Sequence, residues 1–123
     1  MFGQQQNSYW YLASPYTSPD KVIRYNRYGL AEAALAWLLT RRMWTYSPIV
    51  HCHAMAERFA MPKDAVFWQD FNHLMISRAD GLINLQIEGW QESKGVKEEL
   101  QFTLELNKPV LHMLPTPDGF VLA

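Results

Sequence analysis

Two adjacent glutamates, Glu98 and Glu99, stand near the start of residues 93–110, a stretch that reads as a helix followed by a buried strand. The apolar spacing predicts a buried stripe of Val96, Leu100, Thr103 and Leu104. A helix turns about 100° per residue, which puts Glu99 about 60° from Val96 and Glu98 about 160° from it. We therefore expect Glu98 on the solvent-exposed face of the helix and Glu99 at the edge of the buried stripe.

An acid at the position of Glu99 has the surroundings of a reactive group. Burial raises the pKa of a carboxyl, and the positive end of a helix dipole lowers it. Opposed influences of this kind are typical of active-site acids. The alternative is that Glu99 only complements the helix dipole, since acids are common in first turns.

Composition limits the classes of function. The chain has 123 residues, enough for one domain with a core, and we assign residues 8–123 to it and residues 1–7 to a flexible N-terminus. The charge of −1, from 11 basic and 12 acidic residues, gives no basic excess for a nucleic acid polymer or a membrane surface. A single cysteine, Cys52, excludes an internal disulfide and fits a cytoplasmic location.

The elements that position the acid alternate between strand and helix. Strands are expected at residues 8–14, 43–47, 80–87 and 109–114, with a short edge strand in 115–123, and Pro48 is expected to stop the second strand. Helices are expected at residues 18–42, capped by Ser18, at 64–79, capped by Asp64, and at 95–107. A long connection is expected at 48–63, with at most a helical turn in its middle. This order predicts a single-domain α/β fold, a Rossmann/flavodoxin-like three-layer sandwich with a parallel sheet of four to five strands and helices on both faces.

Parallel sheets bind ligands at the carboxyl ends of their strands. This rule places Ser14–Thr17, the loop after Ser47 and the loop 88–94 on one rim. On this rim His51 is a candidate substrate contact, or alternatively a loop histidine satisfied by backbone. Three aromatic residues, Tyr16, Trp68 and Trp90, are candidates to stack on a base, with packing in a core or subunit contact as the alternative.

A metal site is disfavoured. His51, Cys52 and His53 are adjacent and cannot easily turn all three side chains to one ion. A helical pair of His53 and Glu57 would supply only two ligands, fewer than a stable zinc site needs. The segment after the first strand also lacks the G-x-G-x-x-G fingerprint of dinucleotide enzymes. We therefore expect neither a metal nor an organic cofactor.

Several segments together resemble the nucleoside 2-deoxyribosyltransferase-like superfamily, and most closely a small bacterial branch of uncharacterised proteins. They are YLASPY (11–16), SPIVH (47–51), FWQDFNHLMISRAD (67–80), and Gly95-x-x-x-Glu99 followed by NKPV (107–110). The resemblance covers about residues 9–113. It implies cleavage of an N-glycosidic bond through a covalent glycosyl-enzyme intermediate.

The resemblance also implies roles for individual residues. Glu99 would be the nucleophile, Tyr11 would orient it through a hydrogen bond, and Asp70 would hydrogen-bond or protonate the leaving base. Without the resemblance, Asp70 reads equally well as part of a solvated helix face. The substrate is expected to contact the rim residues Ser14, Pro15, Tyr16, His51, Trp90, Ser93, Lys94 and Gly95.

The sequence departs from the transferases at one informative place. They usually carry an acid just before the glycine of the motif, whereas this chain has Ser93 and Lys94. The Lys94 cation, and Arg24 with it, would favour a phosphorylated substrate, and the helix start at Gly95 would assist. We therefore place a nucleoside or nucleotide N-glycosidase ahead of a strict transferase.

The alternative is a module that binds a nucleotide without turnover. It would tolerate Gln at position 99, whereas an enzyme would need the carboxylate. In either case we expect a small nucleoside or nucleotide as ligand, no nucleic acid polymer, no membrane, and a homo-oligomer, a dimer or higher.

Overall fold

The computed structural model describes residues 7–62 and 64–123 and has the expected α/β fold. The strands are β1 (Trp10–Ala13), β2 (Thr45–Tyr46), β3 (Gly81–Leu85), β4 (Val110–Thr116) and β5 (Gly119–Leu122). The helices are α1 (Lys21–Thr40), α2 (Pro48–Arg58), α3 (Ala65–Arg78) and α4 (Lys94–Glu105), with a short 3₁₀ turn, η1 (Trp90–Glu92). The N-terminal prediction for residues 1–6 lies outside the described residues.

The five strands form one sheet in the order β2-β1-β3-β4-β5. The first four are parallel, and β5 pairs antiparallel with β4 as the edge strand expected in residues 115–123. β2 pairs with one edge of β1, and the chain then crosses over so that β3 pairs with the other edge of β1. The topological switch point therefore lies between β1 and β3, where ligands bind in open α/β sheets.

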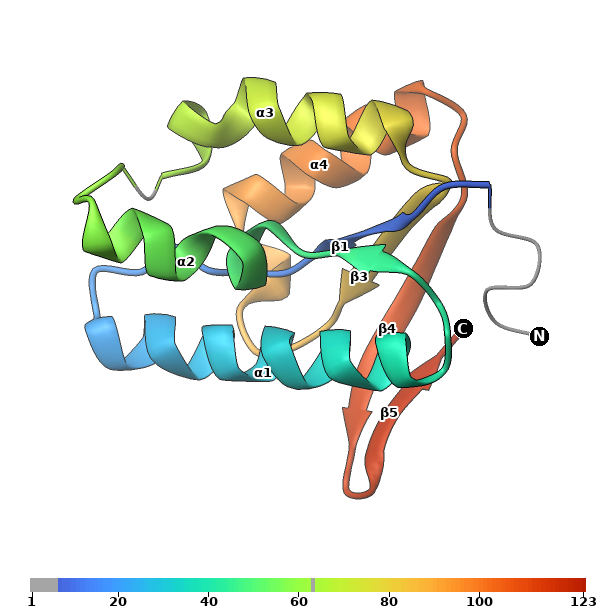
Figure 1. Ribbon diagram of the computed structural model, residues 1–123, viewed down its shortest axis with the longest axis horizontal. Coiled ribbons are helices and arrows are strands. Elements are labelled where there is room, and N and C mark those ends of the chain that lie inside the picture. Colours follow the sequence, from blue (N-terminus) through green and yellow to red (C-terminus); the bar gives the residue numbers. More distant parts are fainter. Residues whose placement is uncertain (1–6, 63) are drawn as a thin grey trace.

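Helices cover both faces of the sheet, α1 on one and α3 with α4 on the other (Figure 1). The side chains of β1 alternate between the two cores, as strand geometry requires. Leu12 packs with α1, while Tyr11 and Ala13 pack with α3 and α4. Tyr11 thus has its ring beneath α4, the helix that carries Glu99. In the part of the chain described, no helix has the length and apolarity needed to cross a bilayer.

Residues 48–58 are helical where the sequence analysis expected a connection with at most a helical turn. Ser47 caps α2, its hydroxyl accepting a hydrogen bond from the Val50 N–H, and Pro48 occupies the first turn. Pro48 is consistent with the end of a strand in the sequence, yet proline at the first helical position equally marks the start of a helix. The cap of α1 also differs, because Asp20 rather than Ser18 accepts from the Val22 N–H.

The buried face of α4 is rotated from the expected stripe. Val96, Glu99 and Thr103 are buried, but Leu104 is 58% exposed, so its predicted burial was wrong. Glu98, expected on the solvent-exposed face, is partly covered and accepts hydrogen bonds from Gln69 and His73 of α3. The cause is α3, which packs along α4 on the side of Glu98 and Glu99 and so moves the buried arc away from Leu104.

Gly81 begins β3, the strand between β1 and β4, and a substitution there tests how closely the neighbouring residues pack. A Cβ there would lie 2.6 Å from the Pro109 carbonyl oxygen and 2.4 Å from the Trp10 ring. We expect Gly81→Ala to lower the free energy of unfolding by about 3 kcal/mol, because the backbone oxygen cannot move aside cheaply. Gly29→Ala is the matched control: nothing lies within 4 Å of its Cβ position in α1. It should stabilise by about 1 kcal/mol, and urea denaturation of both variants checks the pair.

Candidate active site

A cavity of about 440 Å³ opens beside Glu99, at the carboxyl ends of the central strands. Its walls come from the segment after β1, from α2, from α3 and from the start of α4. The lining residues are Ser14, Tyr16, Thr17, Pro48, Ile49, Cys52, His53, Ala56, Asp64, Val66, Trp68, Asn72, Glu92, Ser93, Lys94, Gly95 and Glu99. This volume suits a ligand of nucleoside size.

Glu99 is held from two sides. The Tyr11 hydroxyl donates to Glu99 Oε2 at 2.8 Å, and the Asn72 amide donates to the same oxygen at 3.2 Å. Oε1 has no hydrogen-bond partner among the described residues. The contact between Tyr11 and Glu99 is the one that the resemblance implies, although the catalytic role of either residue remains a prediction.

Burial raises the pKa of Glu99 from 4.5 to about 7, opposed by the hydrogen bonds from Tyr11 and Asn72, while the neighbouring Glu98 raises it further. Burial, and then the charge of Glu99, raise the pKa of Tyr11 well above its ordinary value. Tyr11 therefore remains protonated and donates at neutral pH. Glu99, in contrast, exchanges its proton near neutrality and exists in both the acid and the carboxylate form.

Asn72, not Asp70, is the residue of α3 that reaches Glu99. Asp70 is exposed and does not line the cavity. Helical spacing explains the difference, because two residues turn a helix by about 200°. Asn72 shares its helix face with Trp68 and with the buried Ile76, at spacings of four residues. The positions of Trp68 and Ile76, four residues on either side of Asn72, were the sequence signal that could have pointed to it.

The start of α4 forms the wall of the cavity beside Glu99. Ser93 caps the helix, its hydroxyl accepting a hydrogen bond from the Val96 N–H at 3.1 Å. Lys94 and Gly95 are the first helical residues and line the cavity, as Ser93 does, while their contact with a substrate stays a prediction. The first N–H groups of a helix have no intrahelical acceptor and attract anions. This wall therefore combines backbone donors with the Lys94 cation.

Two buried polar atoms at the cavity have no partner among the described residues. They are the Ser14 hydroxyl and the Asn72 carbonyl oxygen Oδ1, on side chains that are each 8% exposed. A buried polar group without a hydrogen bond costs about 1–3 kcal/mol. Both residues line the cavity, so a ligand with hydroxyl or amino groups would satisfy them.

Aromatic and imidazole rings form another part of the cavity wall. The Tyr16 hydroxyl is hydrogen-bonded to His53 Nδ1, and both residues line the cavity. Trp68 on α3 also lines it, and its ring N–H donates to the Pro62 carbonyl at 2.8 Å, which fixes the indole. His53, considered in the sequence only as a metal ligand, is therefore a cavity residue that the sequence analysis missed.

Three of the expected rim residues do not line the cavity. Pro15 is fully buried next to Ser14. His51 is exposed on the first turn of α2, where its ring stacks on Tyr46 and Nδ1 contacts the Ser47 carbonyl. Trp90 lies half-buried in η1. In residues 7–62 and 64–123, no three His, Cys, Asp or Glu side chains gather as metal ligands.

The chain was compared with known families. The family model described as a domain of unknown function (DUF1937) matches residues 8–114, most of the chain. No curated protein matches the sequence.

Proposed function

We propose that this chain, which belongs to the DUF1937 family, is an N-glycosidase of nucleosides or nucleotides on the α/β scaffold described above. The observation that carries the proposal is Glu99, a buried acid beside a cavity of nucleoside size. Its pKa of about 7 leaves a large share of carboxylate at neutral pH. The resemblance to the nucleoside 2-deoxyribosyltransferase-like superfamily supports the same reaction.

The contacts of Glu99 suit a nucleophile. Tyr11 and Asn72 hold Oε2, which fixes the plane of the carboxylate and leaves Oε1 for the substrate. Oε1 would form a bond to the anomeric carbon while the electron pair of the C–N bond leaves with the base. Water would then release the sugar, or a second base would accept it. Hydrolysis and transfer share this intermediate.

The cavity offers contacts for each part of a nucleoside. Trp68 presents an indole fixed by its hydrogen bond to Pro62, and such a ring can stack on a planar base. The unpartnered oxygens of Ser14 and Asn72 would accept hydrogen bonds from sugar hydroxyls or from base amino groups. Asp70 has no part in this arrangement, because its side chain is exposed outside the cavity.

A phosphate on the substrate would bind at the start of α4, where Lys94 and the first helical N–H groups line the cavity. We expect Lys94→Ala to weaken binding of a nucleoside 5′-monophosphate by roughly tenfold, the worth of one charge-assisted contact, and to leave the unphosphorylated nucleoside unchanged. Calorimetric titration of both ligands measures the difference. Lys97→Ala, one turn further along α4 and outside the cavity, is the matched control. Equal losses for both ligands would argue against a phosphate site.

Release of free base tests the proposed reaction. The protein is incubated with ribo- and deoxyribonucleosides, their 5′-monophosphates and NAD, and free base is followed by chromatography with Glu99→Gln beside it. Release from one class of substrate, lost in the variant, supports the glycosidase. Absence of release from every substrate, with tight binding by both proteins, would favour the second candidate, a nucleotide-sensing module. Lys94 at the cavity in place of the transferases' acid is the feature that favours this module.

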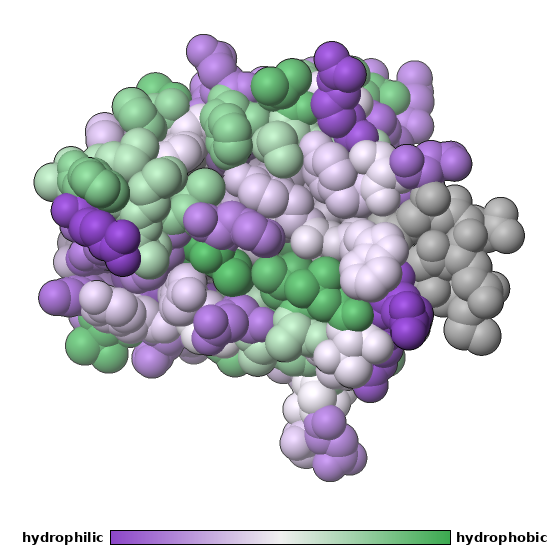
Figure 2. Space-filling model, in the orientation of Figure 1, coloured by the Kyte–Doolittle hydropathy of each residue, from purple (hydrophilic) through white to green (hydrophobic). Residues whose placement is uncertain are grey.

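Self-association is also part of the proposal. Apolar side chains lie exposed over the end of α2 and the beginning of α3 (Figure 2), among them Met55, Phe59, Val66 and Phe67. Contiguous apolar surface of this kind commonly marks a protein contact. It supports the expected homo-oligomer, which sedimentation equilibrium would detect.

A further inference from the structure

The proposed cleavage leaves one chemical requirement open. A departing base takes the electron pair of the C–N bond and needs a proton on its ring nitrogen. The residue expected to supply it, Asp70, lies outside the cavity, and the Asn72 amide is not an acid. Besides Glu99, two carboxyls line the cavity: Asp64, whose side chain accepts the Phe67 N–H as the cap of α3, and the exposed Glu92.

We propose that Tyr16 and His53 form the proton donor for the leaving base, an inference that rests on the proposed N-glycosidase function. Tyr16 follows β1 and His53 lies on α2, and their hydrogen bond joins the Tyr16 hydroxyl to His53 Nδ1. Both line the cavity that Glu99 lines from α4. The nucleophile and the proton donor would thus meet the substrate from different walls, as cleavage of the glycosidic bond requires.

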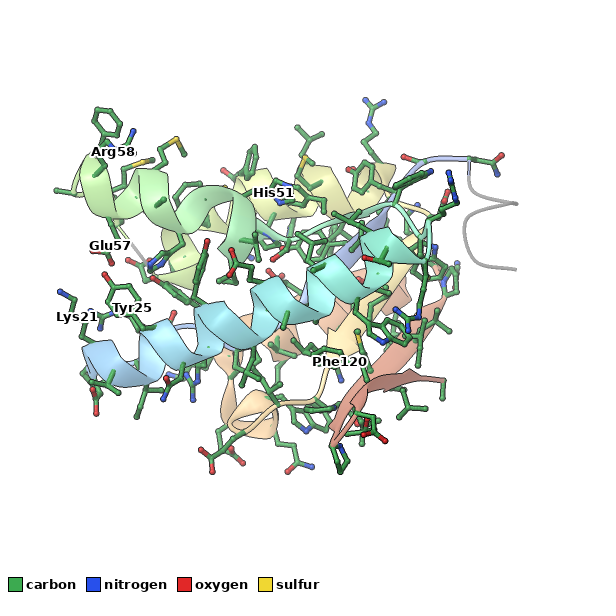
Figure 3. All side chains as sticks on the ribbon, turned by 60° about the horizontal axis from the view of Figure 1, so that its bottom comes forward. Lys21, Tyr25, His51, Glu57, Arg58 and Phe120 are labelled. Atoms are coloured by element: carbon green, nitrogen blue, oxygen red, sulfur yellow. The ribbon has the colours of Figure 1, made fainter. Side chains whose placement is uncertain are left out.

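Three tyrosine rings surround His53 beside the cavity. His53 is only 7% exposed, and the rings of Tyr25 and Tyr28 from α1 pack on it together with that of Tyr16. Tyr28 has its centroid 4.6 Å from the imidazole, within the range of a cation–π contact. Glu57 lies one turn further along α2 and points toward Tyr25 across the gap to α1 (Figure 3).

An acid, Glu57, and a base, Arg24, lie close enough to Tyr16 to influence its pKa. Burial is the largest influence on the pKa of Tyr16 and raises it above its ordinary value, while Glu57 raises it further and Arg24 lowers it. Tyr16 accordingly holds its own proton at neutral pH. It can pass that proton on only if another proton replaces it, and His53 is the group placed to do so.

The step balances in protons and electrons. As the C–N bond breaks, the base nitrogen takes the bonding pair and receives the Tyr16 hydroxyl proton, while the His53 imidazolium returns a proton to the tyrosine oxygen. Glu99 Oε1 forms the bond to the anomeric carbon. In the second half, water attacks that carbon, the bond to Glu99 breaks, and the proton of water returns through Tyr16 to His53. Tyr16 is a catalytic residue in this scheme, and His53 acts through it.

A pair of substrates that differ in their need for the proton tests this inference. A guanine nucleoside needs a proton on its leaving base, whereas the 7-methylguanine form is already cationic and its base departs neutral. For an enzyme restricted to pyrimidines, a uracil nucleoside and its 5-nitro derivative, whose base leaves readily as an anion, replace them. Both substrates of a pair carry the same sugar, and the same phosphate if any, as the substrate that the wild-type protein cleaves.

We expect Tyr16→Phe and His53→Gln to slow release of the proton-requiring base by about 100-fold or more and to change release of the other base much less. Tyr9→Phe, which removes a hydroxyl bonded to the Met75 carbonyl outside the cavity, is the matched control and should behave as wild type. Near-ultraviolet circular dichroism checks folding, and Tyr16→Phe is the milder change if His53→Gln unfolds.

Equal losses on both substrates would overturn the proton-donor role and leave Tyr16 as a packing or binding residue. In that case the proposed function would still stand, provided Glu99→Gln abolishes release from both. Failure of the wild-type protein to release either base would remove the proposed function and this inference together.

Discussion

Replacing Glu99 by Gln is expected to lower the rate of base release by about 10⁴-fold or more, the loss typical of removing a covalent nucleophile. The amide can accept the hydrogen bonds of Tyr11 and Asn72 in place of Oε2, so the cavity keeps its shape while the attacking oxygen is lost. Single-turnover assays with the substrate found by base release measure the effect. Calorimetry should show that the variant still binds the substrate.

Glu98→Gln is the matched control, because it neutralises the adjacent carboxylate of the same helix. Glu98 faces Gln69 and His73 of α3 and does not line the cavity. This variant should retain most of the activity. Its activity should begin to rise at a lower pH than that of the wild type, because the charge of Glu98 helps to raise the pKa of Glu99. A Glu98 variant as inactive as the Glu99 variant would assign the effect to the interface of α3 and α4 instead of to a nucleophile.

Local sequence signals predicted most of the fold. Alternating apolar runs and capping residues identified all of the major strands and three of the four helices. The helix that was missed, α2, is only partly apolar and begins at Pro48, a residue that also ends strands. Its two buried side chains, His53 and Ala56, do not form an apolar stripe that a periodicity analysis detects.

The site was predictable where one element determines it. Ser93, Lys94, Gly95 and Glu99 share the first turns of α4, and helical spacing alone put Glu99 toward the interior. Contacts between distant segments were not predictable in the same way. The bond from Asn72 to Glu99 joins residues 27 positions apart, and it depends on how α3 lies against α4. The same packing exposed Leu104 and covered Glu98.

The ionisation of Glu99 should also be visible in the stability of the protein, whatever the substrate. Its pKa is raised in the folded state, to about 7 from an ordinary value of 4.5, chiefly by burial. The folded protein therefore binds this proton more tightly than the unfolded chain does. The resulting stabilisation is fully present below about pH 4.5 and is lost as the pH rises through about 7.

The full loss across this interval amounts to on the order of 3 kcal/mol, at about 1.4 kcal/mol for each pKa unit. Glu99→Gln has no proton to lose, so its free energy of unfolding should not carry this decline. Other groups titrate in both proteins, and the difference between the two isolates Glu99. Urea denaturation from pH 4.5 to 8 is expected to show the variant gaining stability relative to wild type as the pH rises, with most of the gain between pH 5 and 7.5. If the difference in free energy of unfolding between variant and wild type stays constant across this range, Glu99 is already ionised at pH 5. The argument that burial raises its pKa would then fail.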